Sequence, residues 1–254
     1  MTPEELRAAL PTFTNFRDVG GRKTYDGRQL RTGRLFRSDS VHDITEVEAD
    51  LLVETLGIRC IVDLRVGLEA DKHGRGPLAR HPVSYLNVPL IDVDGPPGEP
   101  GRVMLDFYVD HLENDVNLPV AVETVAFAVR RPTLVHCAGG KDRTGLTLLL
   151  VELLCGVTRE DAIADFVATA DNMEALRQRL RSWPYYRRNM ETLSPEIYRC
   201  ESRSIEGLVH VLEERYGTAH EWARAKGVPD AAVDLLRERL VEPPRPLDER
   251  DRDF

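Results

Sequence analysis

The sequence predicts an α/β fold, with a central parallel or mixed sheet flanked by helices and a helix-rich C-terminal half. In the first half, short apolar and β-branched runs alternate with segments of helical periodicity, which is typical of a sheet covered by helices. From Thr158 onward the periodic segments are nearly all helical. Since no linker separates the halves, we expect a single domain over residues 1–241 and a disordered tail over residues 242–254.

Local signals predict the elements of the first half. Thr45 and Glu48 have the spacing of a capping box, which predicts a helix from Thr45 to about Leu56 that Gly57 ends. The run IRCIVDL over residues 58–64 predicts a buried strand. Further strands are expected at 85–90 and 133–136, and helices at 103–112, 116–130 and 143–155.

The second half has recognisable helix starts. Thr158 is followed by Asp161 in the first turn, and Pro229 precedes an acidic turn, so both residues fit the N-terminus of a helix. We expect helices at 158–170, 172–181, 204–216, 218–226 and 229–241.

The overall charge excludes one class of partner. The chain has 34 Lys and Arg against 43 Asp and Glu, a formal net charge of -9, so we expect no nucleic-acid partner. The longest apolar run, Leu146 to Gly156, contains Thr147 and Glu152 and is far shorter than the ~20 residues of a bilayer span. A stable membrane span is therefore not expected.

The cysteines and the first residues indicate a compartment. Cys60, Cys137, Cys155 and Cys200 form no Cys-x-x-Cys pair and have no His cluster beside them, so we expect no metal ion and a reducing environment. The first ten residues lack the apolar core of a secretion signal, which predicts a cytoplasmic protein.

The segment HCAGGKDRTG, which begins at His136, follows a predicted strand and opens a predicted helix. Ala138, Gly139 and Gly140 are small enough for backbone N–H groups to turn inward, and such groups at a helix N-terminus bind anions. Arg143 adds a planar fork that matches two phosphate oxygens. The loop is therefore expected to bind a phosphoryl group.

The same loop would activate its cysteine. N–H donors, a helix N-terminus and Arg143 favour the thiolate of Cys137, which is then a nucleophile at neutral pH. We expect Thr144 to donate a hydrogen bond to the sulfur. We also expect His136 to bury its imidazole and orient the loop.

These residues resemble a known family. HCAGGKDRTG is similar to the phosphate-binding loop of the Cys-dependent protein tyrosine phosphatases, and more narrowly to the bacterial branch with Lys-Asp before the loop arginine. The segments NFRDVGG, GRLFRS, DLR, DAIADFV and EERYG agree, so the resemblance covers about residues 13–241. It implies a phosphomonoester hydrolase with a phosphocysteine intermediate and no cofactor. Its substrates would be phosphorylated proteins, with phosphoinositides as the alternative.

Two residues could protonate the leaving oxygen. Asp142 lies in the loop and is favoured by the resemblance, whereas Asp63 ends the predicted strand at 58–64. If Asp142 is the acid, Asp63 is expected to position Arg65 or the loop, and we group Asp63 and Arg65 with the phosphate-binding residues. Lys141 either contacts the substrate head group or a second phosphate, which we favour, or is a solvated loop lysine.

Three features allow more than one interpretation. Residues 177–188 carry five arginines among Trp183, Tyr185 and Tyr186, and form a mobile lid, a patch that touches anionic lipid transiently or, as we favour, a solvated helix face with a turn at Pro184. Cys60 is a core thiol or the partner of Cys137 in a protective disulfide. A pseudophosphatase that only binds phosphorylated partners is a further alternative, although Cys137, Arg143 and Asp142 argue for catalysis.

Overall fold

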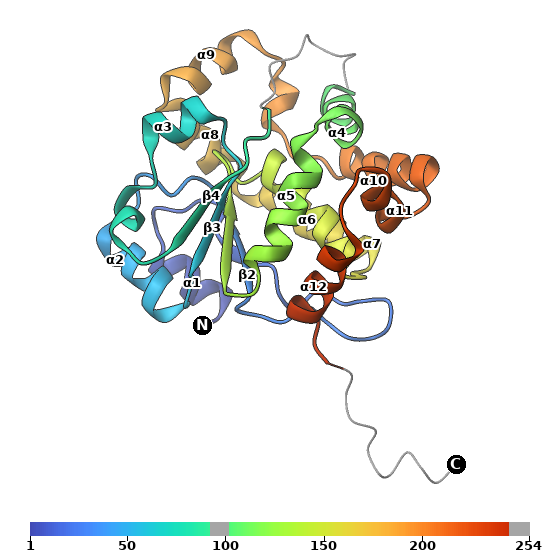
Figure 1. Ribbon diagram of the computed structural model, residues 1–254. Coiled ribbons are helices and arrows are strands. Elements are labelled where there is room, and N and C mark those ends of the chain that lie inside the picture. Colours follow the sequence, from blue (N-terminus) through green and yellow to red (C-terminus); the bar gives the residue numbers. More distant parts are fainter. Residues whose placement is uncertain (92–101, 244–254) are drawn as a thin grey trace.

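The computed structural model describes residues 1–91 and 102–243 and has a five-stranded sheet at its centre (Figure 1). The strand order is β1-β2-β5-β3-β4. β2 (Leu35–Ser38), β5 (Thr133–His136), β3 (Cys60–Asp63) and β4 (Ser84–Asn87) are parallel, and β1 (Arg17–Asp18) is antiparallel to β2. The predicted fold class, a mixed sheet flanked by helices, is confirmed.

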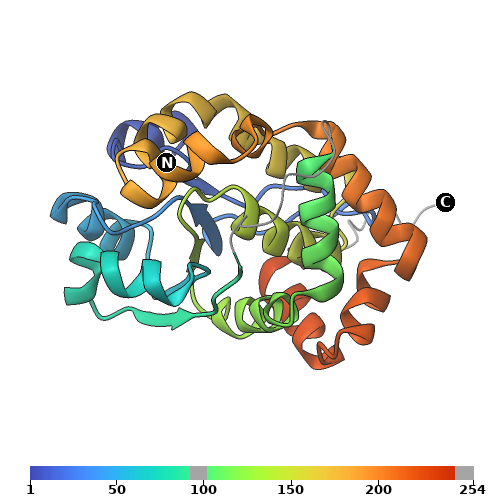
Figure 2. The same ribbon diagram turned by 90° about the horizontal axis from the view of Figure 1, so that it is seen from above.

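Three of the parallel strands, β2, β5 and β3, are buried on both faces, whereas β4 at the edge is mostly exposed. Phe36, Leu134 and Ile61 are neighbours in register and belong to one apolar core. Val135 and Val62, the next row along the strands, belong to the other. Figure 2 shows the corresponding two groups of helices on opposite sides of the sheet.

The helices of the first group come from the N-terminal part of the chain. They are α1 (Pro3–Ala9), α2 (Glu46–Asp50), which continues as a π-helical turn over Leu51–Thr55, and α3 (Gly67–His73), with a 3-10 turn at Gly76–Arg80. The second group contains α4 (Val103–Asn114), α5 (Asn117–Ala128), α6 (Asp142–Leu154), α7 (Arg159–Val167), α10 (Ser202–Tyr216), α11 (Ala219–Ala225) and α12 (Asp230–Leu240).

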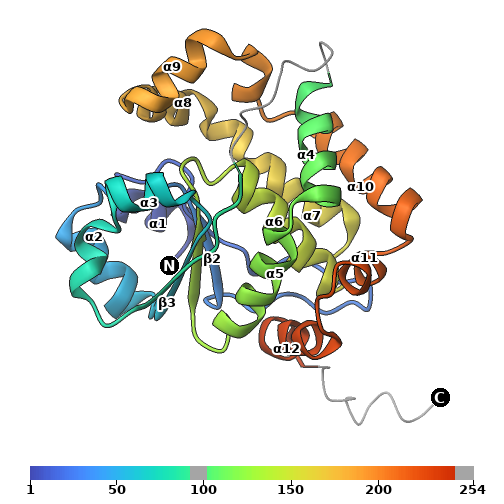
Figure 3. The same cartoon turned by 45° about the horizontal axis from the view of Figure 1, so that its top comes forward.

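A third apolar cluster lies at the carboxyl end of β5. It joins Ala138, directly after the strand, to α8 (Met173–Arg181) and α9 (Pro184–Thr192), which follow a 3-10 turn at Ala168–Asn172 and precede another at Pro195–Tyr198. Figure 3 shows α8 and α9 beyond one end of the sheet, on the same side as the N-terminal end of α4. The two helices therefore cover the segment that leaves β5.

Several capping residues and one strand occur where the sequence predicts them. The side chains of Thr45 and Glu48 form the predicted capping box, and Thr158 accepts a hydrogen bond from the N–H of Asp161. The strand predicted at 133–136 matches β5 residue for residue. A capping residue fixes the start of a helix through hydrogen bonds to residues two or three positions further on, so it can be recognised from the sequence alone.

Other elements differ from the prediction. The chain turns at Ser182 and Trp183, directly before Pro184, as expected, but the helix that follows, α9, was not predicted. Pro184 occupies the first turn of α9, where its missing N–H costs no hydrogen bond. β1, β2, α1 and α3 were not predicted. β2 ends in Arg37 and Ser38, which are polar yet fully buried, so the strand has no continuous apolar run.

The end of the domain extends slightly beyond the predicted boundary. The N–H of Glu242 donates to the carbonyl of Gln29 at 2.9 Å, so ordered contacts reach into the predicted tail. Residues 244–254 of that tail lie outside the described residues. Within the described ranges, none of the helices combines the length and apolar character needed to span a membrane.

Candidate active site

The segment predicted to bind phosphate connects β5 to α6 at the carboxyl end of the sheet. It turns sharply at Gly140, whose φ is +64°. A Cβ on Gly140 would lie 2.3 Å from the carbonyl oxygen of Ser38, so both the backbone conformation and the close approach require glycine. This residue type allows the loop to curl back over the sheet edge.

The carbonyl groups of the loop face away from Cys137. The N–H of Ser40 donates to Ala138 O at 3.0 Å, the Asn15 amide to Gly139 O at 3.0 Å and Arg37 to Gly140 O at 2.7 Å. A trans peptide points its N–H opposite to its C=O, and the described residues contain no cis peptide. The N–H groups therefore face the other side.

The sulfur of Cys137 occupies that inner side. The N–H of Gly140 donates to Cys137 Sγ at 3.2 Å, and Cys137 is only 2% exposed. The N-terminus of α6 begins at Asp142 and adds the positive end of a helix dipole. The arrangement can stabilise a thiolate or the oxygens of a phosphoryl group.

Ion pairs brace the outer side of the loop. Arg37 is fully buried and pairs with Asp165 at 2.6 Å, and Arg17 contacts both Asp165 at 3.0 Å and the side-chain oxygen of Asn15 at 2.6 Å. Burial would raise the pKa of Asp165, but the arginines outweigh it and lower that pKa. Asn15 and Arg37 are functional residues that sequence reasoning missed, although segments containing them carried the family resemblance.

Arg143 points toward partners from two distant elements. Its Nη1 lies 2.6 Å from Glu69 Oε2, at the start of α3, and its Nη2 lies 3.0 Å from the Tyr186 hydroxyl on α9. Burial opposes the charge of Glu69, but Arg143 and Tyr186 favour it, so the pKa of Glu69 is lowered. Neither Glu69 nor Tyr186 was assigned to the site from sequence.

Asp142, the favoured acid, lies at the wall of the same cavity as Cys137. Its Oδ1 accepts a hydrogen bond of 2.6 Å from Tyr108 on α4 and lies 3.3 Å from Lys141 Nζ. Burial and the negative charge of Asp142 raise the pKa of Tyr108, so the hydroxyl remains a donor.

Lys141 also lines the cavity, but its ammonium group is engaged elsewhere. It donates to the carbonyl oxygen of Arg199 at 2.8 Å and to that of Ile197. Lys141 is buried, so the interpretation as a solvated loop lysine is wrong. It ties the loop to the 3-10 turn Pro195–Tyr198.

Asp63 and Arg65 lie beneath the loop and not among the residues that line the cavity. Both are fully buried, and they form an ion pair at 2.6 Å. Burial would raise the pKa of Asp63, but His136, Arg65 and the Tyr85 hydroxyl favour its charge, and the pKa falls to about 2. This geometry disfavours Asp63 as an acid.

Arg65 supports the loop from below. Its Nη1 donates to the Ser40 hydroxyl at 3.1 Å, and the N–H of Ser40 in turn holds Ala138 O. The arrangement agrees with a positioning role for Asp63 and Arg65. It does not place them where a phosphate at Cys137 would contact them.

His136 and Thr144 flank the loop differently. His136 is buried with Nδ1 3.1 Å from the carbonyl oxygen of Cys137, and burial lowers its pKa, so it is placed to orient the loop. The Thr144 hydroxyl is buried and has no hydrogen-bond partner in residues 1–91 and 102–243. The expected bond from Thr144 to the sulfur is therefore not formed, and Gly140 supplies the donor.

The cavity above Cys137 is small. Its volume is about 40 Å³, which leaves room for only a few water molecules. Leu176 and Leu180 of α8 and Tyr186 of α9 line it, and all three are buried against Ala138. Helices α8 and α9 thus form a cover over the loop. Leu180 and Tyr186 belong to it, whereas four arginines of the same segment are exposed, as expected for a solvated helix face, namely Arg177, Arg181, Arg187 and Arg188.

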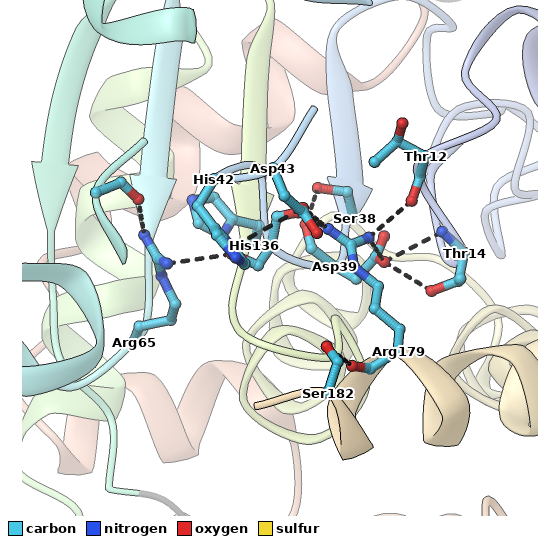
Figure 4. A network of polar contacts seen from close by, with 12 residues as sticks. Thr12, Thr14, Ser38, Asp39, His42, Asp43, Arg65, His136, Arg179 and Ser182 are labelled. Atoms are coloured by element: carbon cyan, nitrogen blue, oxygen red, sulfur yellow. Dashed lines mark hydrogen bonds and ion pairs between the residues drawn. The ribbon is translucent and has the colours of Figure 1, made fainter. Parts of the chain in front are cut away.

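Arg179 holds α8 in place (Figure 4). Its guanidinium contacts the carboxylates of Asp39 and Asp43 and donates to the carbonyls of Thr12 and Ser40 at 3.0 and 2.7 Å. Asp39 also accepts from the N–H of Thr14 at 3.1 Å. One face of α8 is therefore fixed to the segments that precede β1 and follow β2.

Of the two interpretations of Cys60, the disulfide with Cys137 is wrong and the core thiol is confirmed. Cys60 pairs in register with Thr133 at the start of β5, whereas Cys137 follows the end of that strand. Four residues of strand separate their Cα atoms by about 13 Å, and a disulfide needs less than about 7 Å. Cys60 is a buried core thiol, and burial raises its pKa.

Comparisons of the sequence with a family model and with a characterised protein point to the same family. The sequence model of the family described as "Tyrosine phosphatase family" matches residues 8–242. The triple specificity protein phosphatase PtpB of Mycobacterium tuberculosis is 28% identical over 278 aligned residues, which cover 91% of this chain and 98% of PtpB.

Two solved structures are also similar. The core catalytic domain of the PP-IP phosphatase SIW14 of S. cerevisiae is 17% identical with a TM-score of 0.40, and the alignment covers 82% of this chain and 93% of that domain. P. aeruginosa TpbA is 18% identical with a TM-score of 0.38, over 65% of this chain and 91% of TpbA.

Proposed function

This chain belongs to the tyrosine phosphatase family, and on that premise we propose that it hydrolyses phosphate monoesters of proteins through a phosphocysteine intermediate on Cys137. The observation that carries the proposal is the hydrogen bond from the N–H of Gly140 to Cys137 Sγ. The three successive carbonyls of residues 138–140 are bound from outside the loop. A thiolate in such a loop faces the phosphorus of a bound ester.

The first step transfers the phosphoryl group to sulfur. Cys137 Sγ attacks phosphorus, the bond from phosphorus to the leaving oxygen breaks, and Asp142 gives that oxygen its proton. The inward N–H groups and Arg143 stabilise the equatorial oxygens as charge develops. Arg143 is already fixed by Glu69, so its fork needs little reorganisation.

The second step regenerates the enzyme. Water attacks phosphorus, the bond between phosphorus and sulfur breaks, and Asp142, now ionised, accepts the proton of that water. Inorganic phosphate leaves and the Cys137 thiolate is restored. The loop residues Ala138, Gly139, Gly140 and Lys141 bind the phosphoryl group through their backbone N–H groups.

Phosphotyrosine and phosphoserine or phosphothreonine in proteins are the proposed substrates. The name of the mycobacterial relative refers to triple specificity, which supports phosphoinositides as the second candidate. A lipid substrate would bring the enzyme into transient contact with an anionic membrane surface. The four cysteines are all free thiols, which supports a reducing, cytoplasmic place of action.

Turnover of an aryl phosphate in excess EDTA tests the mechanism. Cys137→Ser should abolish turnover, whereas the matched control Cys200→Ser should keep it. Acid quenching of the wild-type enzyme during turnover should trap phosphate on Cys137. Full activity of Cys137→Ser would exclude the phosphocysteine route, and absence of any turnover in the wild type would favour a phospho-binding pseudophosphatase.

The role of Asp142 is tested through the leaving group. We expect Asp142→Asn to lower kcat by ~10²–10⁴-fold with a basic leaving group such as an alkoxide. The loss should be much smaller with nitrophenolate, which leaves without a proton. Equal losses with both leaving groups would exclude Asp142 as the acid.

A further inference from the structure

A second cavity lies beside the cover over the catalytic loop. Its volume is about 310 Å³, and it is lined by Arg177, Arg181, Met190, Pro195, Tyr198 and Arg199. Of these residues only Tyr198 also lines the cavity at Cys137. The second cavity is therefore a separate space that shares one wall with the catalytic one.

The periodicity of α8 explains how one helix serves both cavities. Leu176 and Leu180 are one turn apart and line the catalytic cavity. Arg177 and Arg181 follow each of them by one residue, which is about 100° around the helix, and line the second cavity. The apolar face of α8 thus closes the catalytic site, and its basic face opens onto the second site.

The charge of the second cavity is strongly positive for a chain with a net charge of -9. Three guanidinium groups line it, and none of its lining residues is acidic. Among the described residues, Arg177 pairs with Glu174 at 3.5 Å and Arg199 with Glu201 at 3.6 Å, and these pairs are largely exposed and therefore weak.

Arg181 is less restrained than its two neighbours. Its side chain forms no hydrogen bond or ion pair with any residue in the ranges 1–91 and 102–243. All three guanidinium groups are thus available to an external anion.

We propose that Arg177, Arg181 and Arg199 bind a phosphate monoester dianion, distinct from the phosphoryl group that Cys137 attacks. Planar guanidinium forks match pairs of phosphate oxygens, and three of them suit a doubly charged group better than a carboxylate. Met190 and Tyr198 provide apolar contact for the body that carries the phosphate. A volume of about 310 Å³ accommodates a phosphate with a small carrier.

The site is also connected to the catalytic loop. Lys141 donates to the carbonyl oxygen of Arg199 and lies 3.3 Å from Asp142. An anion held by Arg199 would therefore stabilise the wall to which the loop is tied. The dianion comes either from a second phosphate on the same substrate or from free phosphate.

Calorimetric titration of the full chain with inorganic phosphate tests the site. We expect the wild type to bind two phosphates and the double variant Arg177→Gln/Arg181→Gln to bind one, with at least a tenfold loss of affinity at the missing site. The matched control is Arg187→Gln/Arg188→Gln, which removes the same charge from exposed positions of α9 that do not line the cavity. The control should keep both phosphates.

Two results would overturn the proposal. One is unchanged phosphate binding in Arg177→Gln/Arg181→Gln, and the other is an equal loss in the control, which would indicate a general effect of net charge. The variant Arg177→Lys/Arg181→Lys keeps the charge but not the fork, and we expect it to bind the second phosphate more weakly than the wild type. Because the assay measures binding, it does not depend on Cys137 being the nucleophile.

A kinetic comparison then separates the two sources of the dianion. If the second phosphate belongs to the substrate, the ratio of kcat/KM for a doubly over a singly phosphorylated tyrosine peptide should fall about tenfold in Arg177→Gln/Arg181→Gln and stay constant in the control. If the dianion is free phosphate, that ratio should not change. Added phosphate should then change the rate of the wild type beyond the competitive inhibition at the catalytic loop that the wild type and the variant share.

Discussion

The hydroxyl of Tyr108 donates a hydrogen bond of 2.6 Å to Oδ1 of Asp142, and this contact joins a buried residue of α4 to the first residue of α6. Tyr108 is 2% exposed, so its ring has one orientation and the hydroxyl one direction. The carboxylate proposed to protonate the leaving group is therefore aimed by a side chain that does not itself line the cavity.

Tyr108→Phe should lower kcat for substrates whose leaving group needs a proton. Without the donor, the carboxyl group of Asp142 is no longer held in one position, so kcat should fall several-fold with a phosphate ester of a basic leaving group. The loss should be much smaller with nitrophenyl phosphate, whose leaving group needs no proton. The ratio of kcat for the two esters measures the effect.

Tyr85→Phe is the matched control for this experiment. Tyr85 donates to Asp63 at the same distance of 2.6 Å, but beneath the loop. Its removal should leave the ratio of kcat for the two esters unchanged. If Tyr108→Phe and Tyr85→Phe change that ratio equally, the contact between Tyr108 and Asp142 does not position the acid.

Tyr186→Phe should loosen the cover over Cys137. The Tyr186 hydroxyl links α9 to Arg143 at 3.0 Å and also donates to Glu69. Without it we expect iodoacetamide to alkylate Cys137 several-fold faster, because the thiol is only 2% exposed when the cover is closed. Mass spectrometry of the Cys137 peptide over time measures the rate.

The exposed Tyr25 offers a control for that measurement. Its hydroxyl accepts a hydrogen bond from the N–H of Arg159 and lies in a different cavity. Tyr25→Phe should not change the rate of alkylation. An unchanged rate in Tyr186→Phe would mean that this hydroxyl does not hold the cover.

Arg179→Met should destabilise the protein by about 3 kcal/mol, because it leaves the buried carboxylate of Asp39 without its cation. The free energy of unfolding in urea gives the value. Arg177→Met changes the same residue type on the same helix, where the only ion pair is exposed and spans 3.5 Å. We expect it to cost less than about 0.5 kcal/mol, and equal costs would contradict an anchoring role for Arg179.

Asp63 should contribute to acid denaturation. Its pKa is lowered to about 2, so its ion pair with Arg65 is fully present above about pH 4 and is lost as the pH falls toward 2. The loss amounts to about 2 kcal/mol of unfolding free energy. In Asp63→Asn, this part of the pH dependence of the unfolding free energy should disappear.

Unfolding measured between pH 4 and pH 2 tests this expectation. Asp106→Asn is the control. Asp106 forms an ion pair with Arg102 on the surface, where the side chain of Asp106 is 47% exposed and that of Arg102 is 60% exposed. It should reproduce the pH dependence of the wild type. If the unfolding free energy of Asp63→Asn falls with pH as steeply as that of the wild type, other carboxylates are responsible for the loss of stability in acid.

The segment from β5 to α6 could be predicted from sequence because its signals are local. An apolar strand, small residues that allow a tight turn and the beginning of an apolar helix lie within about twenty consecutive positions, and the strand bounds agree residue for residue. The nucleophile and its arginine were proposed from the same segment. The chemistry of that loop depends on backbone N–H groups, which the turn itself supplies.

The partners of those residues had no such signal. Glu69, Tyr186 and Tyr108 reach the loop across 74, 43 and 34 positions of sequence. β2 was missed for a related reason, since Arg37 is acceptable inside a sheet only because Asp165 of α7 neutralises it. Contacts of this range depend on how the elements pack.

By itself the sequence determined the fold class and the place of the loop, and it proposed Cys137 and Arg143 for catalysis, because periodicity, glycine and charge act over a few residues. It favoured Asp142 over Asp63 through the family resemblance alone, since each is an aspartate at the end of a strand or the start of a helix. Only the tertiary structure separated them, by burying Asp63 with Arg65 beneath the loop and exposing Asp142 to the cavity. Burial and distance between remote segments are properties of the folded chain, and no local pattern encodes them.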